Sequence, residues 1–209
     1  MKQSKAVIYY PEIKDALNFT DEKFKTFYCN YPELNWVYAE SQCDFYKEIE
    51  DADYIFALGF KKDVYQYAKK LKAVFTCMAG KESIPRAEDK SIQYYNGSFH
   101  GHLMAESLLG VMLYFNQEIS VMAENQRHKS WSGHQIFGQR RQLKGQSIAI
   151  IGYGAIGEVF AQTLNTLSMN IYAVQRTHHS GRCEATGATF IHVNDLENKL
   201  STFDHVVSV

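Results

Sequence analysis

Three glycines with the spacing G-x-G-x-x-G constrain the fold more than any other feature of this sequence, because of the segments that flank them. They are Gly152, Gly154 and Gly157. The apolar run Ser147–Ile151 directly before them predicts a strand, and the apolar positions within Ala155–Leu167 predict a helix directly after them. A further apolar run, Met169–Val174, follows at the spacing that two parallel strands joined by a helix require. The segment therefore predicts a β-α-β unit of a doubly wound α/β domain.

The same glycines suit a chain that binds the diphosphate of a dinucleotide. Gly152 permits the tight turn out of the strand, Gly154 lets a pyrophosphate reach the backbone, and Gly157 lets the helix pack closely on the strand. Free N–H groups at the start of the helix, around Ala155 and Ile156, would meet the anion with the help of the helix dipole. We therefore predict a dinucleotide site at these five residues. A glycine-rich turn in another kind of β-α unit is the alternative.

The end of the second strand carries information about the ribose. Sites that prefer NAD usually have Asp or Glu about 20 residues beyond the glycines, whereas this sequence has Gln175 followed by Arg176 and Thr177. Without that carboxylate a ribose 2′-phosphate is not repelled. Arg176 can pair with the phosphate, Thr177 can donate to it, and Arg182 could add positive charge. The pattern predicts NADP(H) in preference to NAD(H), unless Arg176 is merely a surface arginine.

The first hundred residues alternate short apolar runs with polar, helix-like stretches. The expected strands are Ala6–Tyr10, Leu34–Tyr38, Tyr54–Leu58, Ala73–Cys77 and Ile92–Tyr95. The expected helices are Asp21–Asn30, Ser41–Glu50 and Lys61–Lys70. Thr20 and Ser41 are expected to cap the first two of these helices. Strands that alternate with helices indicate another parallel sheet covered on both faces, so the first hundred residues are expected to form a small α/β domain of their own.

A long apolar segment follows the first hundred residues. His102–Phe115 is apolar nearly all round, so we expect a helix that is buried on more than one side, at a domain junction or a subunit interface. The polar stretch Arg127–Arg141 indicates an extended arm or loop. Beyond the β-α-β unit, Thr189–Ile191 and Asp204–Val209 predict strands, and Asn194–Leu200 predicts a short helix.

Composition excludes several other classes of protein. Of the 209 residues, 45% are hydrophobic and 22% are charged, and the net charge of -1 gives no field that favours nucleic acid or an anionic membrane. The four cysteines form no C-x-x-C pair and suit a reducing compartment. The sequence has no signal-peptide pattern and no apolar run of about 18 residues. We therefore expect a cytoplasmic location, with no membrane and no nucleic-acid partner.

Four segments together resemble one protein family. The run Leu143–Gly157 resembles the entrance to the cofactor domain of D-isomer-specific 2-hydroxyacid dehydrogenases. The other three segments are Leu71–Gly80, Asn96–Glu106 and Asp204–Val209, which resemble the substrate-loop strand, the interdomain linker with its long helix, and a later strand of the cofactor domain. The segments occur in the family's order. The glyoxylate/hydroxypyruvate reductase branch is the most similar, chiefly because of Gln175 and Arg176.

The resemblance implies a fold and an activity. It implies a flavodoxin-like substrate domain over 1–98 and a Rossmann cofactor domain over 99–209, which together reduce a small 2-keto acid to a D-2-hydroxy acid with NAD(P)H. The substrate carboxylate would be held by backbone N–H groups at Ala79 and Gly80, as adjacent amides in a turn can hold an anion; an ordinary turn is the alternative. Met104 would face the nicotinamide, and core packing is its other possible role. Pairing of two copies through 102–115 and 127–141 is also implied.

The family's catalytic arginine, histidine and glutamate match no position in residues 1–209, because they lie beyond the strand in which this chain ends. We therefore predict no catalytic residue in the chain, and we expect a C-terminally truncated, unstable protein without reductase activity of its own. His100 and His102 form an H-x-H pair without a nearby carboxylate cluster, so no metal site is predicted. The alternative to a reductase is a non-catalytic dinucleotide-binding or interaction module, or an inactive fragment.

Overall fold

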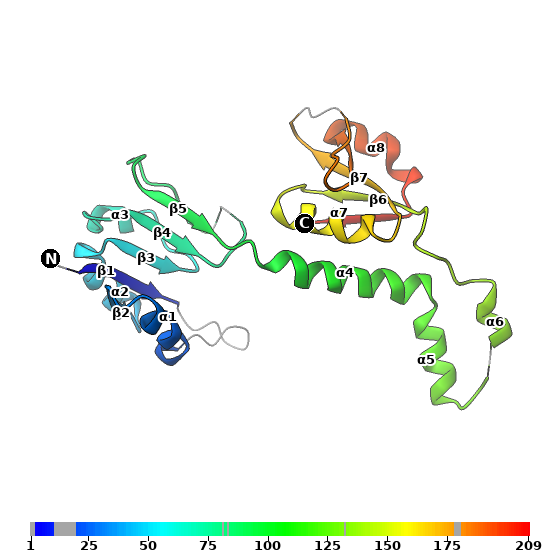
Figure 1. Cartoon of the computed structure of the whole chain (residues 1–209), viewed down its shortest axis with the longest axis horizontal. Coiled ribbons are helices and arrows are strands. Elements are labelled where there is room, and N and C mark those ends of the chain that lie inside the picture. Colours follow the sequence, from blue (N-terminus) through cyan, green and yellow to red (C-terminus); the bar gives the residue numbers. More distant parts are fainter. Residues whose placement is uncertain (1–2, 11–19, 81, 83, 132, 178–180) are drawn as a thin grey trace. The chain divides into compact units, whose positions relative to one another are not determined.

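The chain divides into two compact units, Met1–Ser98 and Phe99–Val209. The computed structural model describes residues 3–10, 20–80, 82, 84–131, 133–177 and 181–209 (Figure 1). The first unit is called unit 1 and the second unit 2. Each unit is built on its own parallel sheet, so the α/β fold class predicted from the sequence is confirmed.

Unit 1 has a five-stranded parallel sheet in the order β2-β1-β3-β4-β5 among its described residues. The strands are β1 (Ser4–Tyr9), β2 (Leu34–Tyr38), β3 (Tyr54–Ala57), β4 (Ala73–Thr76) and β5 (Gln93–Asn96). Every predicted strand is present, with ends that move by up to two residues. This strand order is that of flavodoxin-like doubly wound sheets, in which β1 is central and the chain winds first to one side and then to the other.

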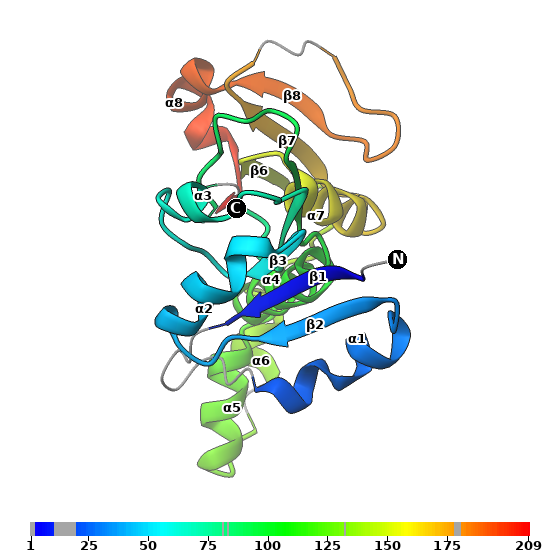
Figure 2. The ribbon, with the colours of Figure 1, turned by 90° about the vertical axis from the view of Figure 1, so that its left-hand side faces the viewer.

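Both faces of the unit 1 sheet are covered, because successive residues of a buried strand point to opposite faces. Val7 of β1 lies in a core with Phe45 and Ile49, which belong to α2 (Gln42–Glu48) and η2 (Ile49–Asp51). Its neighbour Ile8 lies in a second core with Phe24, from η1 (Asp21–Phe24), which leads into α1 (Lys25–Asn30). Figure 2 shows α1 beside β2, with α2 on the other side of the sheet.

The predicted helix ends in unit 1 are only partly correct. Ser41 caps α2 as expected, because its hydroxyl accepts the Asp44 N–H at 3.1 Å. Thr20 occupies the expected N-cap position before η1 with an extended backbone, but its side chain makes no capping hydrogen bond. The expected helix over 61–70 shrinks to α3 (Val64–Tyr67). Val64 is the one buried residue of that helix, and so short an amphipathic segment has too little packing to extend it.

Unit 2 contains a four-stranded parallel sheet in the order β8-β7-β6-β9 among its described residues. The strands are β6 (Ser147–Ile151), β7 (Asn170–Gln175), β8 (Thr189–His192) and β9 (His205–Ser208). The predicted strand over 147–151 matches β6 to the residue. The expected helix over 194–200 is a succession of the short turns η3 (Val193–Asp195), α8 (Leu196–Lys199) and η4 (Leu200–Thr202). The sheet order reverses between β6 and β9, and a ligand of such a sheet binds where the order reverses.

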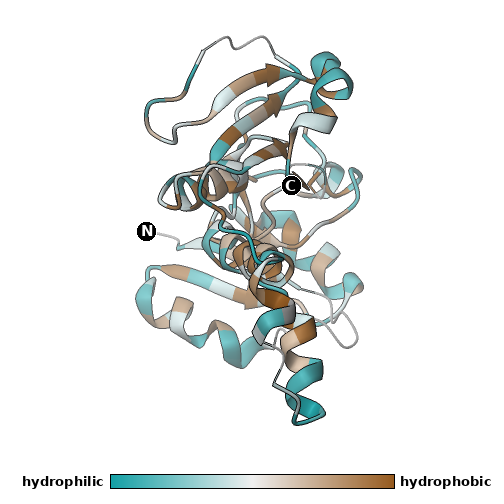
Figure 3. Ribbon diagram, turned by 90° about the vertical axis from the view of Figure 1, so that its right-hand side faces the viewer, coloured by the Kyte–Doolittle hydropathy of each residue, from teal (hydrophilic) through white to brown (hydrophobic). Residues whose placement is uncertain are grey.

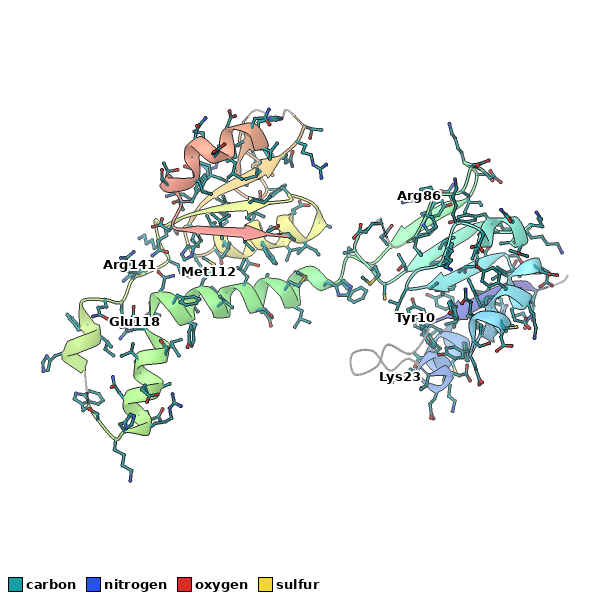
Figure 4. The ribbon with its side chains drawn as sticks, turned by 180° about the vertical axis from the view of Figure 1, so that it is seen from behind. Tyr10, Lys23, Arg86, Met112, Glu118 and Arg141 are labelled. Carbon is teal, nitrogen blue, oxygen red and sulfur yellow. The ribbon has the colours of Figure 1, made fainter. Side chains whose placement is uncertain are left out.

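Two long helices pack against each other in unit 2. They are α4 (His100–Asn116) and α7 (Ala155–Asn165). A Cβ on Gly101 of α4 would lie 2.9 Å from Cγ2 of Val159 in α7, so a glycine is needed for this close approach. Farther along, Met112 is 3% exposed and packs in the core of unit 2; Figure 4 shows it pointing from α4 towards the sheet.

Within unit 2 this helix is buried on one side, and its burial on a further side, at a domain junction or a subunit interface, stays a prediction. One face of α4 packs in unit 2, while its other face exposes apolar side chains. In Figure 3, which looks nearly along the axis of this helix, much of its ribbon has hydrophobic colours. The exposed apolar residues of α4 are Leu103, Met104, Val111, Tyr114 and Phe115. None of the helices that the structure describes has the length and hydrophobicity to cross a membrane.

The stretch 127–141 was expected to be an extended arm or loop, and its described residues form a loop that contains one short helix. Glu118, labelled in Figure 4, adopts a left-handed conformation with φ of 53° and turns the chain from α4 into α5 (Ile119–Arg127). A short helix, α6 (Gly133–Phe137), follows. The chain then returns to the end of α4, where the N–H of Arg141 donates to the carbonyl of Asn116 at 2.8 Å. Trp131 and Phe137 remain 94% and 86% exposed.

Candidate cofactor-binding site

A cleft of about 710 Å³ lies at the carboxyl ends of the strands of unit 2. It is lined by Ile151, Gly152, Tyr153, Gly154, Val174, Gln175, Arg176, Thr177, Val193, Ser208 and Val209. Segments that follow β6, β7 and β8 contribute, together with the end of β9. The fold thus gathers most of the predicted cofactor residues at the sheet edge where the strand order reverses.

Gly152 makes the turn out of β6. Its φ is +92°, a left-handed value that residues with a Cβ rarely adopt. A Cβ there would also lie 2.7 Å from the carbonyl oxygen of Val209. Both the backbone angle and the closeness of the β9 segment therefore require glycine at this position.

Gly154 and the residues after it form an open, polar surface. Gly154 is the N-cap of α7, and a Cβ on it would meet nothing within 4 Å. The N–H groups of Ala155 and Ile156 belong to the first turn of α7, where no carbonyl of the helix can accept from them. Gly154 and Ala155 are exposed. Space and free donors occur together here, which is what an anion at a helix N-terminus needs.

Gly157 has a different role from Gly154. It is buried, and a Cβ there would lie 2.8 Å from the carbonyl oxygen of Gly152 and 3.3 Å from Cγ2 of Ile150. Because both contacts belong to the strand and turn that precede the helix, this glycine sets the distance between β6 and α7. The helix start can then lie directly behind the turn.

A buried side-chain oxygen of Gln175 lies at the ribose end of the candidate site. Gln175, the last residue of β7, donates from Nε2 to the carbonyl of Tyr153 at 3.4 Å, and its Oε1 is buried with no hydrogen-bond partner in the described structure. An orphaned buried acceptor costs free energy, so a donor from a ligand would be favoured there. Arg176 and Thr177 follow at the exposed edge of the cleft. Residues 178–180 lie outside the described residues.

Arg182 does not reach the cleft. Its Nε donates to the carbonyl of Gly187 at 2.9 Å and closes a loop between β7 and β8. The expected extra positive charge at the ribose is therefore absent from the lining of the cleft, and of the two arginines considered only Arg176 contributes to it.

The predicted substrate loop lies in unit 1, after β4. Asn96 holds it from β5 by donating from Nδ2 to the carbonyl of Gly80 at 2.7 Å, and the N–H of Gly97 donates to the carbonyl of Met78 at 3.1 Å. These bonds occupy carbonyl oxygens. The role of the N–H groups of Ala79 and Gly80 in holding an anion stays a prediction. The carboxylate of Glu82 lies against Gly80, within 2.5 Å of where a Cβ would be.

Comparisons with known proteins identify unit 2. Residues 109–209 match the model of the D-isomer specific 2-hydroxyacid dehydrogenase NAD-binding domain. These residues belong to that family. No curated protein matches the sequence.

Solved structures share the fold of the NAD-binding domain and of unit 1. A D-isomer specific 2-hydroxyacid dehydrogenase family protein from Aeromonas salmonicida is 23% identical, with a TM-score of 0.74 over 100% of this chain and 64% of its own. The NADPH-dependent glyoxylate/hydroxypyruvate reductase of Sinorhizobium meliloti, in complex with NADP and sulfate, is 16% identical, with a TM-score of 0.75 over 99% of this chain and 62% of its own.

A neighbour that binds the other cofactor has the same fold. The NAD-dependent formate dehydrogenase of Staphylococcus aureus, in complex with NAD, is 17% identical, with a TM-score of 0.65 over 98% of this chain and 64% of its own. The chain thus spans less than two thirds of the length of these neighbours. Because both NAD and NADP occur among them, they establish no cofactor preference for the NAD-binding domain of this chain.

Sequence reasoning missed the side chains that hold the glycine turn of the NAD-binding domain in place. The hydroxyl of Tyr153 lies 2.6 Å from Oγ1 of Thr186, which is fully buried, and the Tyr153 ring packs edge-on against Phe190 at 5.5 Å. Burial raises the pKa of Tyr153 above its ordinary value. These partners are more than 30 residues apart in the sequence, and no local pattern indicates them.

Met104 is placed on α4 and is 41% exposed. Met104 does not line the cleft of the NAD-binding domain. Its predicted position beside the nicotinamide remains a prediction.

Proposed function

We propose that the chain is part of an NAD(P)H-dependent reductase that converts a small 2-keto acid, such as glyoxylate or hydroxypyruvate, to a D-2-hydroxy acid. The glycine turn at the reversal of the strand order is the observation that carries the proposal, because it combines open space at Gly154 with free N–H groups in α7. The family match over residues 109–209 and the shared fold support it.

Each part of the candidate site has a role in this proposal. The first-turn N–H groups of Ala155 and Ile156 hold the diphosphate of the cofactor. The orphaned Oε1 of Gln175 accepts a hydrogen bond from a ribose hydroxyl. In unit 1, the N–H groups of Ala79 and Gly80 bind the carboxylate of the keto acid. The bound nicotinamide supplies the hydride, and residues 1–209 supply binding and orientation.

NADP(H) is the proposed cofactor in preference to NAD(H). The acidic residue that excludes a 2′-phosphate is replaced by Gln175, and Arg176 at the edge of the cleft provides a guanidinium that can pair with that phosphate. Arg176 takes part in no ion pair among the described residues, so its charge is available for a ligand.

Replacing Arg176 by alanine is expected to weaken NADPH binding by about 10- to 100-fold, which is the loss of one charge-assisted hydrogen bond. NADH binding should change by less than twofold. Isothermal titration of the purified chain with each cofactor measures both dissociation constants. Lys144→Ala, a lysine outside the cleft, is the control for charge. Equal weakening of both cofactors, or of neither, would contradict the preference for NADP(H).

A homodimer through the α4–α6 surface is also proposed. We define this surface by six exposed apolar side chains. They are Leu103, Val111, Tyr114, Phe115, Trp131 and Phe137. Large apolar side chains left in water are costly, and several of them on one part of a molecule often mark an interaction site. The partner that we propose is a second copy of the chain, as the family resemblance implies.

Charged substitutions on the α4–α6 surface should separate the two copies. Phe115→Asp, at a side chain that is 68% exposed, should not disturb the core but should place an unpaired charge in the dimer interface. Light scattering after size exclusion should show a dimer for the unmodified chain and a monomer for the variant. Leu200→Asp, which introduces the same charge at an exposed leucine of unit 2 outside the α4–α6 surface, should remain a dimer. A monomeric unmodified chain would overturn this proposal.

A further inference from the structure

His192 lies between two backbone groups at the carboxyl end of the unit 2 sheet. It is the last residue of β8 and lies opposite Gln175 in the register of β7 and β8. Its Nδ1 accepts the N–H of Asn194 at 3.2 Å, and its Nε2 lies 3.0 Å from the carbonyl oxygen of Arg176. Because Nδ1 is an acceptor, the neutral ring carries its proton on Nε2, which donates to Arg176.

The imidazole therefore ties together the two segments that leave β7 and β8. One segment begins with Arg176, and the other begins with Val193 in η3; both line the candidate cofactor cleft. The bond to Asn194 caps η3, and the bond to Arg176 fixes the carbonyl of the residue whose guanidinium is proposed to meet the phosphate.

Fixing this backbone matters because Arg176 has a long, exposed side chain. A side chain of that length loses considerable rotamer entropy when it becomes ordered on a ligand. If its backbone were also free to move, that cost would rise and the affinity for the phosphate would fall. The preceding residue, Gln175, is already held by its bond to Tyr153, so His192 completes the anchoring of the strand end at the next peptide.

We propose that His192 is a positioning residue that sets the affinity of the site for a ribose 2′-phosphate by holding the backbone of Arg176. The inference rests on the proposed NADP(H) preference. The 2′-phosphate is the group that distinguishes NADPH from NADH. Loss of His192 should therefore change the ratio of the dissociation constants of NADPH and NADH. A residue that merely stabilised the fold would weaken both cofactors alike.

The experiment titrates the 209-residue chain with NADPH and with NADH, by calorimetry, for His192→Ala and His192→Phe. Alanine removes the ring, and phenylalanine keeps its bulk without its hydrogen bonds. Both variants should raise the dissociation constant of NADPH by about three- to tenfold, the effect of a lost hydrogen bond, with less than a twofold change for NADH. The ratio does not depend on the folded fraction of a sample, so partial unfolding of a variant does not obscure it.

Two further variants complete the test. Asn170→Ala removes a 2.8 Å side-chain bond to the carbonyl of Gly145 at the opposite end of β7 and should leave the ratio unchanged. Arg176→Ala combined with His192→Ala should bind NADPH no more weakly than Arg176→Ala alone, because His192 acts through Arg176. If the losses of NADPH affinity in the double variant are additive, or if the His192 variants weaken both cofactors equally, the proposed role of His192 is overturned, while the proposed cofactor preference is not affected. If Arg176→Ala leaves NADPH binding intact, the proposed cofactor preference itself fails.

Discussion

Replacing Gly154 by valine is expected to weaken the binding of both NADPH and NADH strongly, while leaving the melting temperature of the chain unchanged within about 2 °C. Gly154 has no left-handed φ, and a Cβ on it meets no atom within 4 Å, so the fold has room for the new side chain. That room is the space that the diphosphate would occupy. Valine should fill it and raise both dissociation constants by on the order of 100-fold, or about 2.7 kcal/mol.

Two measurements on the same sample check this expectation. Calorimetric titration gives the dissociation constants, and thermal unfolding followed by circular dichroism gives the melting temperature. Gly138→Val is a matched control, because Gly138 also has open space around it but lies outside the cofactor cleft. Unimpaired cofactor binding by Gly154→Val would end the assignment of a diphosphate site to this turn.

Replacing Gly157 by valine should cause a large loss of stability, unlike Gly154→Val, which is expected to keep its melting temperature. A Cβ there would lie 2.8 Å from a backbone oxygen of Gly152, and backbone cannot move aside as a flexible side chain can. Forcing α7 away from β6 should cost about 3 kcal/mol or more and lower the melting temperature by on the order of 10 °C. Urea unfolding of unit 2, compared with that of Gly154→Val, measures the difference. Equal stability of the two variants would show that the close packing of α7 on β6 is not needed.

Local patterns predicted the part of the fold that supports the candidate site. The strand over 147–151 follows from its run of apolar residues. The need for Gly152 follows in part from its left-handed φ, and the need for Gly157 follows from contacts with residues a few positions before it. The free N–H groups of Ala155 and Ile156 follow from helix geometry alone, because the first turn of any helix leaves its N–H groups without a carbonyl partner in that helix. For these positions the sequence pattern and the tertiary structure impose the same requirement, so the prediction of the β-α-β unit is confirmed.

Other features depend on contacts that no local spacing encodes. The helices α5 and α6 were missed because the chain reverses at the left-handed Glu118 and is tied back to α4 by Arg141. Thr20 has the right residue type for a cap, yet its side chain makes no capping bond. His192 shows no motif at all, and its importance is visible only because β8 lies beside β7.

Because Gly152 lies close to the carbonyl of Val209, the binding of a nucleotide at the turn and the docking of β9 on the sheet affect each other. The turn that would hold the cofactor is completed by a chain segment more than fifty positions downstream, which is docked by the bond from the Val209 N–H to the Ile151 carbonyl at 2.9 Å. Nucleotide occupancy and the docking of β9 are then thermodynamically linked, and whichever forms first lowers the cost of the other. Saturating nucleotide should accordingly slow amide exchange in β9, a strand that contributes little more than its last residues to the cleft.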